Sequence, residues 1–137
     1  SILLEIEKKI KRKNIFVSGA AHVYDPYTTD QAKEFIHKLS YKLAENEYKI
    51  VSGYGLGIGS MVINGALEFK LNSNYRNLDD LLILRPFPQI QSGSKTISEI
   101  WTDYRKDMIG NAGIAIFMFG NKVNTKDEIV PSKGFGL

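Results

Sequence analysis

The sequence predicts a Rossmann-like α/β domain, with a doubly wound, mostly parallel sheet and helices on both of its faces. Short, uniformly apolar segments alternate along the chain with longer amphipathic segments. The apolar segments are too short for helices, which is typical of strands that are buried on both faces. Small residues or glycine-rich runs follow these segments, and a parallel sheet binds its ligands at that end of its strands.

The composition is that of one folded domain. The chain has 137 residues, of which 43% are hydrophobic and 24% are charged, and it contains no cysteine. Disulfides and thiolate metal sites are therefore excluded. No apolar run reaches the roughly 18 residues of a membrane span, so a cytoplasmic protein without a membrane partner is expected. The net charge of +3 suits a phosphate-bearing ligand, but it is too weak and scattered to favour nucleic acid.

Residues 1–13 form a unit of their own before the domain, which is expected over residues 14–137. We interpret them as a solvated lead-in helix or interdomain linker, and a membrane or nucleic-acid patch is the alternative. The apolar residues recur at helical spacing among lysines and arginines: Ile2, Leu3, Ile6 and Ile10.

Four strands and three intervening helices are expected after this segment. The strands are predicted at residues 14–17, 48–52, 81–84 and 114–119. Helices are predicted from Thr28 to about Asn46, over residues 61–69, and from Thr96 onward, where Thr28–Gln31 and Thr96–Glu99 have capping-box spacing. Residues 72–80 are expected to be a polar connection, and the tail up to Leu137 has no clear element. The first helix should present one apolar stripe: Ala32, Phe35, Ile36, Leu39 and Leu43.

The run GYGLGIGS follows the second strand and has glycine at alternate positions. Backbone amides there, together with the N-terminus of the next helix, suit a phosphate or pyrophosphate. The run matches neither the dinucleotide fingerprint nor a Walker A loop, and a tight strand-to-helix crossing is the alternative. Its candidate ligand-binding residues are Gly53, Gly55, Leu56, Gly57, Gly59 and Ser60.

Further candidates lie at the other strand ends. Ser18, Gly19 and Ala20 follow the first strand, and close strand–helix packing is the alternative there. Three cations could neutralise a multiply charged ligand at this edge: Arg85, Arg105 and Lys122. Phe87 and Asn121, beside Arg85 and Lys122 in the sequence, complete the set.

The sequence offers no catalytic group, no metal site and no cofactor motif. His22 and His37 lack the spacing of metal ligands, and we interpret them as surface histidines. Asp103 and Asp107 form a helical i, i+4 pair, which predicts a solvated face. No nucleophile elbow and no H-E-x-x-H motif is present. The pattern indicates binding rather than catalysis.

Four segments give the chain a resemblance to a known family: IFVSGAA, KIVSGYGLGIGSMVINGALE, LRPFPQ and WTDYRKDMIGNAGIAIFMFGNK. Over residues 14–122 it resembles the SLOG domain of effectors of the Thoeris antiphage system, in the lysine-decarboxylase-like Rossmann superfamily. Phosphoribohydrolases of that superfamily carry a P-G-G-x-G-T-x-x-E motif, and GYGLGIGS has neither that threonine nor that glutamate. The resemblance therefore points to a sensor.

The resemblance implies a ligand and a partner domain. It implies recognition of a cyclic ADP-ribose isomer made by a TIR protein, which rearranges a dimer or tetramer and activates an N-terminal sirtuin-like domain that depletes NAD. It implies that Arg105 and Lys122 contact the ligand and that the glycine loops hold its phosphates. It also implies that a C-terminal helix and strand of the domain are absent here. A nucleotide phosphoribohydrolase is the alternative function, and a nucleic-acid-binding domain is a weaker one.

Overall fold

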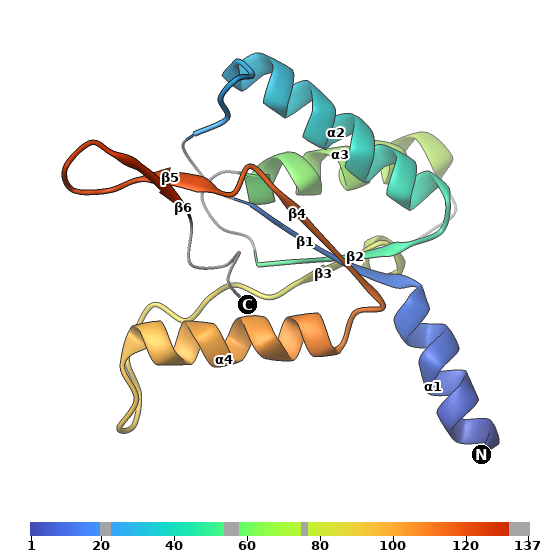
Figure 1. Ribbon diagram of the computed structural model, residues 1–137. Coiled ribbons are helices and arrows are strands. Elements are labelled where there is room, and N and C mark those ends of the chain that lie inside the picture. Colours follow the sequence, from blue (N-terminus) through green and yellow to red (C-terminus); the bar gives the residue numbers. More distant parts are fainter. Residues whose placement is uncertain (20–22, 54–57, 75–76, 132–137) are drawn as a thin grey trace.

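A four-stranded sheet lies at the centre of the molecule (Figure 1). The computed structural model describes residues 1–19, 23–53, 58–74 and 77–131. All neighbouring strands of the sheet are parallel, in the order β3-β2-β1-β4. The strands are β1 (Asn14–Gly19), β2 (Lys49–Ser52), β3 (Leu82–Leu84) and β4 (Ile114–Met118).

Helices cover both faces of the sheet, which confirms the predicted fold class. Helices α2 (Thr29–Glu45) and α3 (Ile58–Ser73) lie on one face, and α4 (Ile97–Gly110) lies on the other (Figure 1). A short 3₁₀ helix, η1 (Leu78–Asp80), precedes β3. Helix α1 (Ile2–Arg12) precedes β1, as expected, and extends away from the body of the molecule.

The two faces of β1 divide the core into two layers. Ile15 and Val17 are buried with residues of α2 and α3, whereas Phe16 is buried with Val51 and Met108 under α4. This division follows from the alternation of side chains along a strand. Hence the short apolar run that predicted β1 contributes buried side chains to both layers of the core.

Helices α2 and α3 approach closely because small residues face each other between them. A Cβ atom added to Gly65 would lie 2.1 Å from the Ser40 Oγ atom and 2.5 Å from the His37 carbonyl oxygen. The buried Ser40 hydroxyl donates to the carbonyl oxygens of Ile36 and His37. The predicted stripe is wrong at one position, because the Phe35 side chain is 54% exposed while Ser40 and Ala44 are buried instead.

Three expected boundaries differ in the structure. Helix α3 runs from Ile58 to Ser73, well beyond the predicted 61–69, so Gly59 and Ser60 belong to its first turn. Ser18 and Gly19 lie within β1, although they were expected to follow it, because they pair with β4. Ile58 and Gly59 are buried and extend α3 toward the sheet. The sequence did not indicate this earlier start of the helix, because these residues belong to the run of glycines.

The tail holds a β-hairpin, so the prediction that it has no element is wrong. Strands β5 (Asn121–Val123) and β6 (Ile129–Pro131) pair antiparallel. The Asn124 side-chain oxygen accepts bonds from the N–H groups of Lys126 and Glu128, which closes the turn together with a positive φ of 59° at Asp127. This turn lacks the Asn-Gly or Asp-Gly signal of short hairpins.

The sequence predicted strands that are buried on both faces of the sheet. Strand β4 is more exposed than this prediction. Ile114 and Phe117 are exposed. The strand lies at the edge of the sheet and pairs only with β1 among the described residues. The uniform apolar pattern therefore identified a strand correctly, but it did not show that the strand occupies an edge.

A capping box starts α2, as predicted. The Thr28 hydroxyl accepts a bond from the Gln31 N–H at 3.2 Å, and the Gln31 side chain accepts from the Thr28 N–H at 3.0 Å. At α4, the Thr96 side chain accepts from the Glu99 N–H. The beginnings of both helices thus follow from local side-chain chemistry.

Replacing Thr28 by alanine is expected to lower the free energy of unfolding by about 1 kcal/mol, because an N-cap hydroxyl is lost from a helix that packs on the core. Urea unfolding followed by circular dichroism measures this change. Ser1→Ala removes the N-cap of α1, which has no buried residue, and should leave the unfolding midpoint unchanged. Equal destabilisation by both variants would contradict the prediction.

Candidate functional site

The carboxyl ends of the four parallel strands meet at one edge of the sheet, and α3 begins there. Gly19 pairs with Met118, and Ser52 pairs with Leu84. A Cβ atom added to Gly19 would lie 2.9 Å from the Cδ1 atom of Ile58, the first residue of α3. The N–H groups of the first turn of α3 are therefore beside the end of β1, in an arrangement suited to an anion.

Two candidate glycines at this edge are required by packing. A Cβ atom at Gly19 would lie 2.2 Å from the Met118 carbonyl oxygen. A Cβ atom at Gly53 would lie 2.3 Å from the Cε2 atom of Phe87. Close packing, the alternative stated for Gly19, therefore explains why both positions have no side chain, whatever ligand they contact.

An aromatic cluster lies next to Gly53. The ring of Phe87 stands 5.7 Å from that of Trp101 and 5.4 Å from that of Tyr104, measured between centroids. The Trp101 Nε1–H donates to the Pro88 carbonyl oxygen at 2.6 Å, which ties α4 to the proline-bounded segment after β3. Trp101 and Tyr104 were not among the predicted site residues, although both stand close to Arg105 in the sequence. Their place beside Arg105 was the one available signal of a site.

Arg105 is stacked on this cluster. Its guanidinium carbon lies 4.9 Å from the centroid of the Phe87 ring. The side chain is half-buried, and burial lowers the pKa of Arg105. No carboxylate of the described residues forms an ion pair with it. The strand-end edge therefore holds a partly desolvated cation that an anionic ligand could pair with.

Arg85 has a partner of its own. Its Nη1 atom lies 2.9 Å from the Asp107 Oδ2 atom, and its backbone N–H donates to the Ser52 carbonyl oxygen. Asp103 pairs with Lys95, which lowers the pKa of Asp103. Asp103 and Asp107 are both exposed, which confirms the predicted solvated face, and each also pairs with a cation from the segment between β3 and α4.

The remaining candidates come from β1 and the hairpin. Ser18 lies opposite Phe117 in the sheet. Lys122 is half-buried in β5, opposite Val130, and Asn121 bridges to Val23. Arg105 lies in α4, as predicted, whereas Lys122 lies in β5, where a loop was expected. Four candidates lie outside the described residues, together with His22: Ala20, Gly55, Leu56 and Gly57.

His37 faces Glu68 across the α2–α3 interface and forms a hydrogen bond with it. Among the described residues no three His, Asp or Glu side chains gather as a metal site would need. In the same part of the chain, no helix is both long and apolar enough to cross a membrane.

Comparison with known proteins identifies the family. The profile of the Sir2- and TIR-associating SLOG family matches residues 1–136. The chain is 48% identical over 134 residues to the NAD(+) hydrolase ThsA of Bacillus cereus (strain MSX-D12) and 43% identical over 134 residues to that of Enterococcus faecium. Each alignment covers 97% of this chain but only 27% of the relative, so the chain spans about a quarter of the length of these proteins. With its family profile, its parallel α/β sheet and these relatives in agreement, the chain belongs to the Sir2- and TIR-associating SLOG family.

Proposed function

We propose that this chain is a sensor domain that binds a cyclic ADP-ribose isomer at the carboxyl edge of its sheet and thereby activates an NAD-depleting effector in antiphage defence. The observation that carries the proposal is the half-buried Arg105, which is stacked on Phe87 and lacks a carboxylate partner among the described residues. An ion pair with an anionic ligand is stronger for a partly desolvated cation without a carboxylate partner than for a solvated one.

The edge offers a complementary group for each part of such a nucleotide. Arg105 and the first N–H groups of α3 suit the pyrophosphate. The aromatic cluster of Phe87, Trp101 and Tyr104 suits stacking against a purine. Lys122 supplies a second cation from the hairpin. Ser18 and the glycine run would complete the cradle around the phosphates.

The wider role rests on the relatives. They are named NAD(+) hydrolases, and the family is described as associating with Sir2 and TIR. We therefore propose that a TIR protein makes the ligand, that a Sir2-like domain elsewhere in the longer protein degrades NAD, and that the domain acts in the cytoplasm as a dimer or tetramer. This chain supplies recognition, and the catalysis belongs to the other domain.

Calorimetric titration tests the proposal. Cyclic ADP-ribose isomers should bind more tightly than ADP-ribose or NAD, because only they are compact anions that match the cationic edge. Chromatography after incubation with NAD, AMP and the cyclic ADP-ribose isomers should recover every nucleotide intact. Release of adenine or ribose phosphate would favour the phosphoribohydrolase alternative, and absence of binding to all of them would overturn the sensor function.

A further inference from the structure

Phe119 joins the sheet to the β5–β6 hairpin in a backbone conformation that is unusual for its side chain. It lies between β4, which ends at Met118, and β5, which begins at Asn121, and its φ is 52°. A bulky residue rarely adopts this left-handed conformation, whereas glycine adopts it readily. The strain persists only if contacts of the Phe119 side chain offset it, so these contacts are the place to look for a role.

Two tyrosines from the segment before α2 hold the Phe119 ring. Its centroid lies 5.1 Å from that of Tyr24 and 6.3 Å from that of Tyr27, and both pairs meet edge to face. The Tyr27 N–H donates to the Tyr24 carbonyl oxygen at 2.9 Å, which closes a turn between the two tyrosines. Phe119 also packs against the core cluster that contains Tyr24. Aromatic contacts therefore fix the connection between the sheet and the hairpin.

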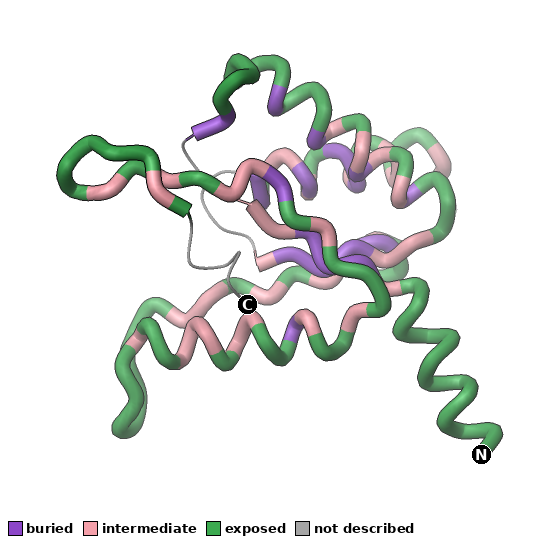
Figure 2. The backbone as a smooth tube through the Cα atoms, in the orientation of Figure 1, coloured by how far each residue is buried: buried purple, intermediate pink, exposed green. Residues whose placement is uncertain are grey.

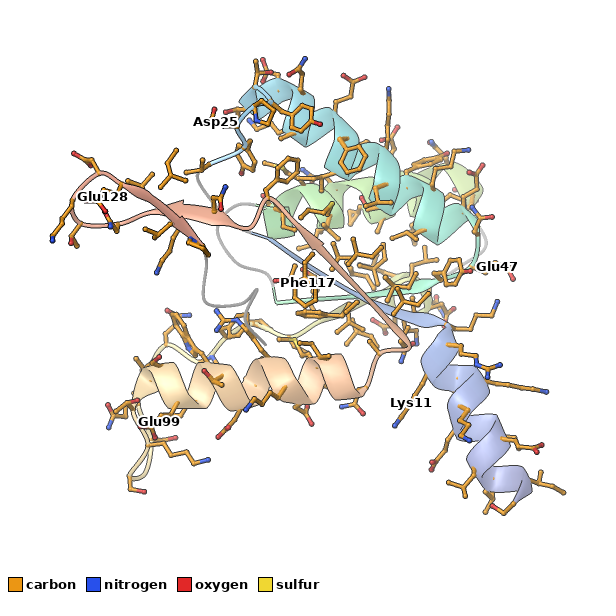
Figure 3. The ribbon with its side chains drawn as sticks, in the orientation of Figure 1. Lys11, Asp25, Glu47, Glu99, Phe117 and Glu128 are labelled. Carbon is orange, nitrogen blue, oxygen red and sulfur yellow. The ribbon has the colours of Figure 1, made fainter. Side chains whose placement is uncertain are left out.

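The hairpin beyond this connection is exposed. None of residues 121–131 is buried, and Figure 2 shows the hairpin without buried positions. In Figure 3, Glu128 marks the part of the hairpin that projects from the body, and Asp25 marks the segment before α2. A hollow of about 470 Å³, lined by residues of both, lies between them. At the base of the hairpin, Asn121 bridges to Val23. The position of the hairpin therefore depends on contacts at its base, where Phe119 lies.

This base carries Lys122, one of the two cations assigned to the nucleotide. Val123 lines the hollow, so Lys122, its neighbour along β5, points to the opposite face of the hairpin. No carboxylate of the described residues forms an ion pair with Lys122. An ammonium on a flexible side chain binds an anion more tightly when the backbone that carries it is already ordered.

We propose that Phe119 is the positioning residue for Lys122. With its ring held by Tyr24 and Tyr27, Phe119 fixes the hairpin so that the Lys122 ammonium meets the phosphates of the ligand. This inference rests on the proposed function, because it concerns the same nucleotide site. Phe119 acts through Lys122 and does not have to touch the ligand itself.

A double-mutant cycle with Lys122→Ala tests this role. Phe119→Leu keeps an apolar side chain at the connection but removes the ring. Tyr27→Leu removes one partner of that ring at an exposed position, so the domain should still fold, which circular dichroism checks. Calorimetric titration with a cyclic ADP-ribose isomer should show that each change weakens binding by about five- to tenfold, somewhat less than loss of a whole charge-assisted contact.

In the Lys122→Ala background, neither change should weaken binding further, because the lysine that it would misplace is already gone. A general structural defect would lower the affinity by the same factor with and without Lys122. Tyr27→Phe is the matched control, since it keeps the ring and should bind as wild type does.

Hydrogen exchange without nucleotide gives a second readout. In Phe119→Leu and Tyr27→Leu, the amides of residues 121–130 should exchange faster than in wild type, whereas those of β1 should keep their rates. Unchanged hairpin exchange, wild-type affinity in both variants, or an equal loss of affinity with and without Lys122 would overturn the inference. If wild type bound no nucleotide, the proposed function would fail together with the role of Lys122, and the exchange rates would still decide whether Phe119 fixes the hairpin.

Discussion

Replacing Gly65 by valine is expected to lower the free energy of unfolding by about 3 kcal/mol, because it overpacks the close contact between α2 and α3. The Cβ atom would lie 2.1 Å from the Ser40 Oγ atom and 2.5 Å from the His37 carbonyl oxygen. The carbonyl oxygen belongs to the backbone of α2, so a rotamer change cannot relieve this clash. Helices α2 and α3 would have to separate over the core that they cover.

Gly110→Ala is the matched control, because a Cβ atom there meets nothing within 4 Å. Gly110 ends α4, where alanine should be neutral or stabilise the helix by up to about 1 kcal/mol. Urea unfolding followed by circular dichroism compares the two variants. If Gly65→Val kept the wild-type midpoint, the close approach of α2 and α3 would be contradicted.

Replacing Arg105 by alanine is expected to weaken binding of a cyclic ADP-ribose isomer by about 10- to 100-fold. A charge-assisted contact contributes about 1.5–3 kcal/mol, and this range corresponds to that loss of affinity. Because the guanidinium also stacks on Phe87, the variant should lose about 1 kcal/mol of stability. Arg105→Lys keeps the charge but loses the planar stack, so its affinity should lie between those of wild type and alanine.

Titration calorimetry gives these affinities, and Trp101 offers a second readout. It is the only tryptophan of the chain and lies beside Phe87, so its fluorescence should respond to a ligand at the aromatic cluster.

Lys122→Ala should also weaken binding, and Lys122→Glu should do so more strongly because it repels phosphate. Arg85→Ala is the comparison, since its side chain already pairs with Asp107 and should matter mainly for packing. Wild-type affinity in both Arg105→Ala and Lys122→Ala would show that the pocket lies elsewhere.

The sequence by itself determined the order of strands and helices and the beginnings of α2 and α4. Those features depend on neighbouring residues: an apolar run, or a threonine three residues before a glutamine or glutamate. It also indicated the strand-end cations, because the carboxyl ends of parallel strands share one edge.

Only the tertiary structure decided what each of these residues faces. It paired Arg85 with Asp107 and stacked Arg105 on Phe87, and it explained Gly53 by the same ring. It placed β4 at an exposed edge and formed the β5–β6 hairpin from a tail without a strong turn signal. The physical reason is that, apart from those of the hairpin, these contacts join segments far apart in the chain. Their geometry depends on strand order and helix packing, which residue spacing within one segment does not contain.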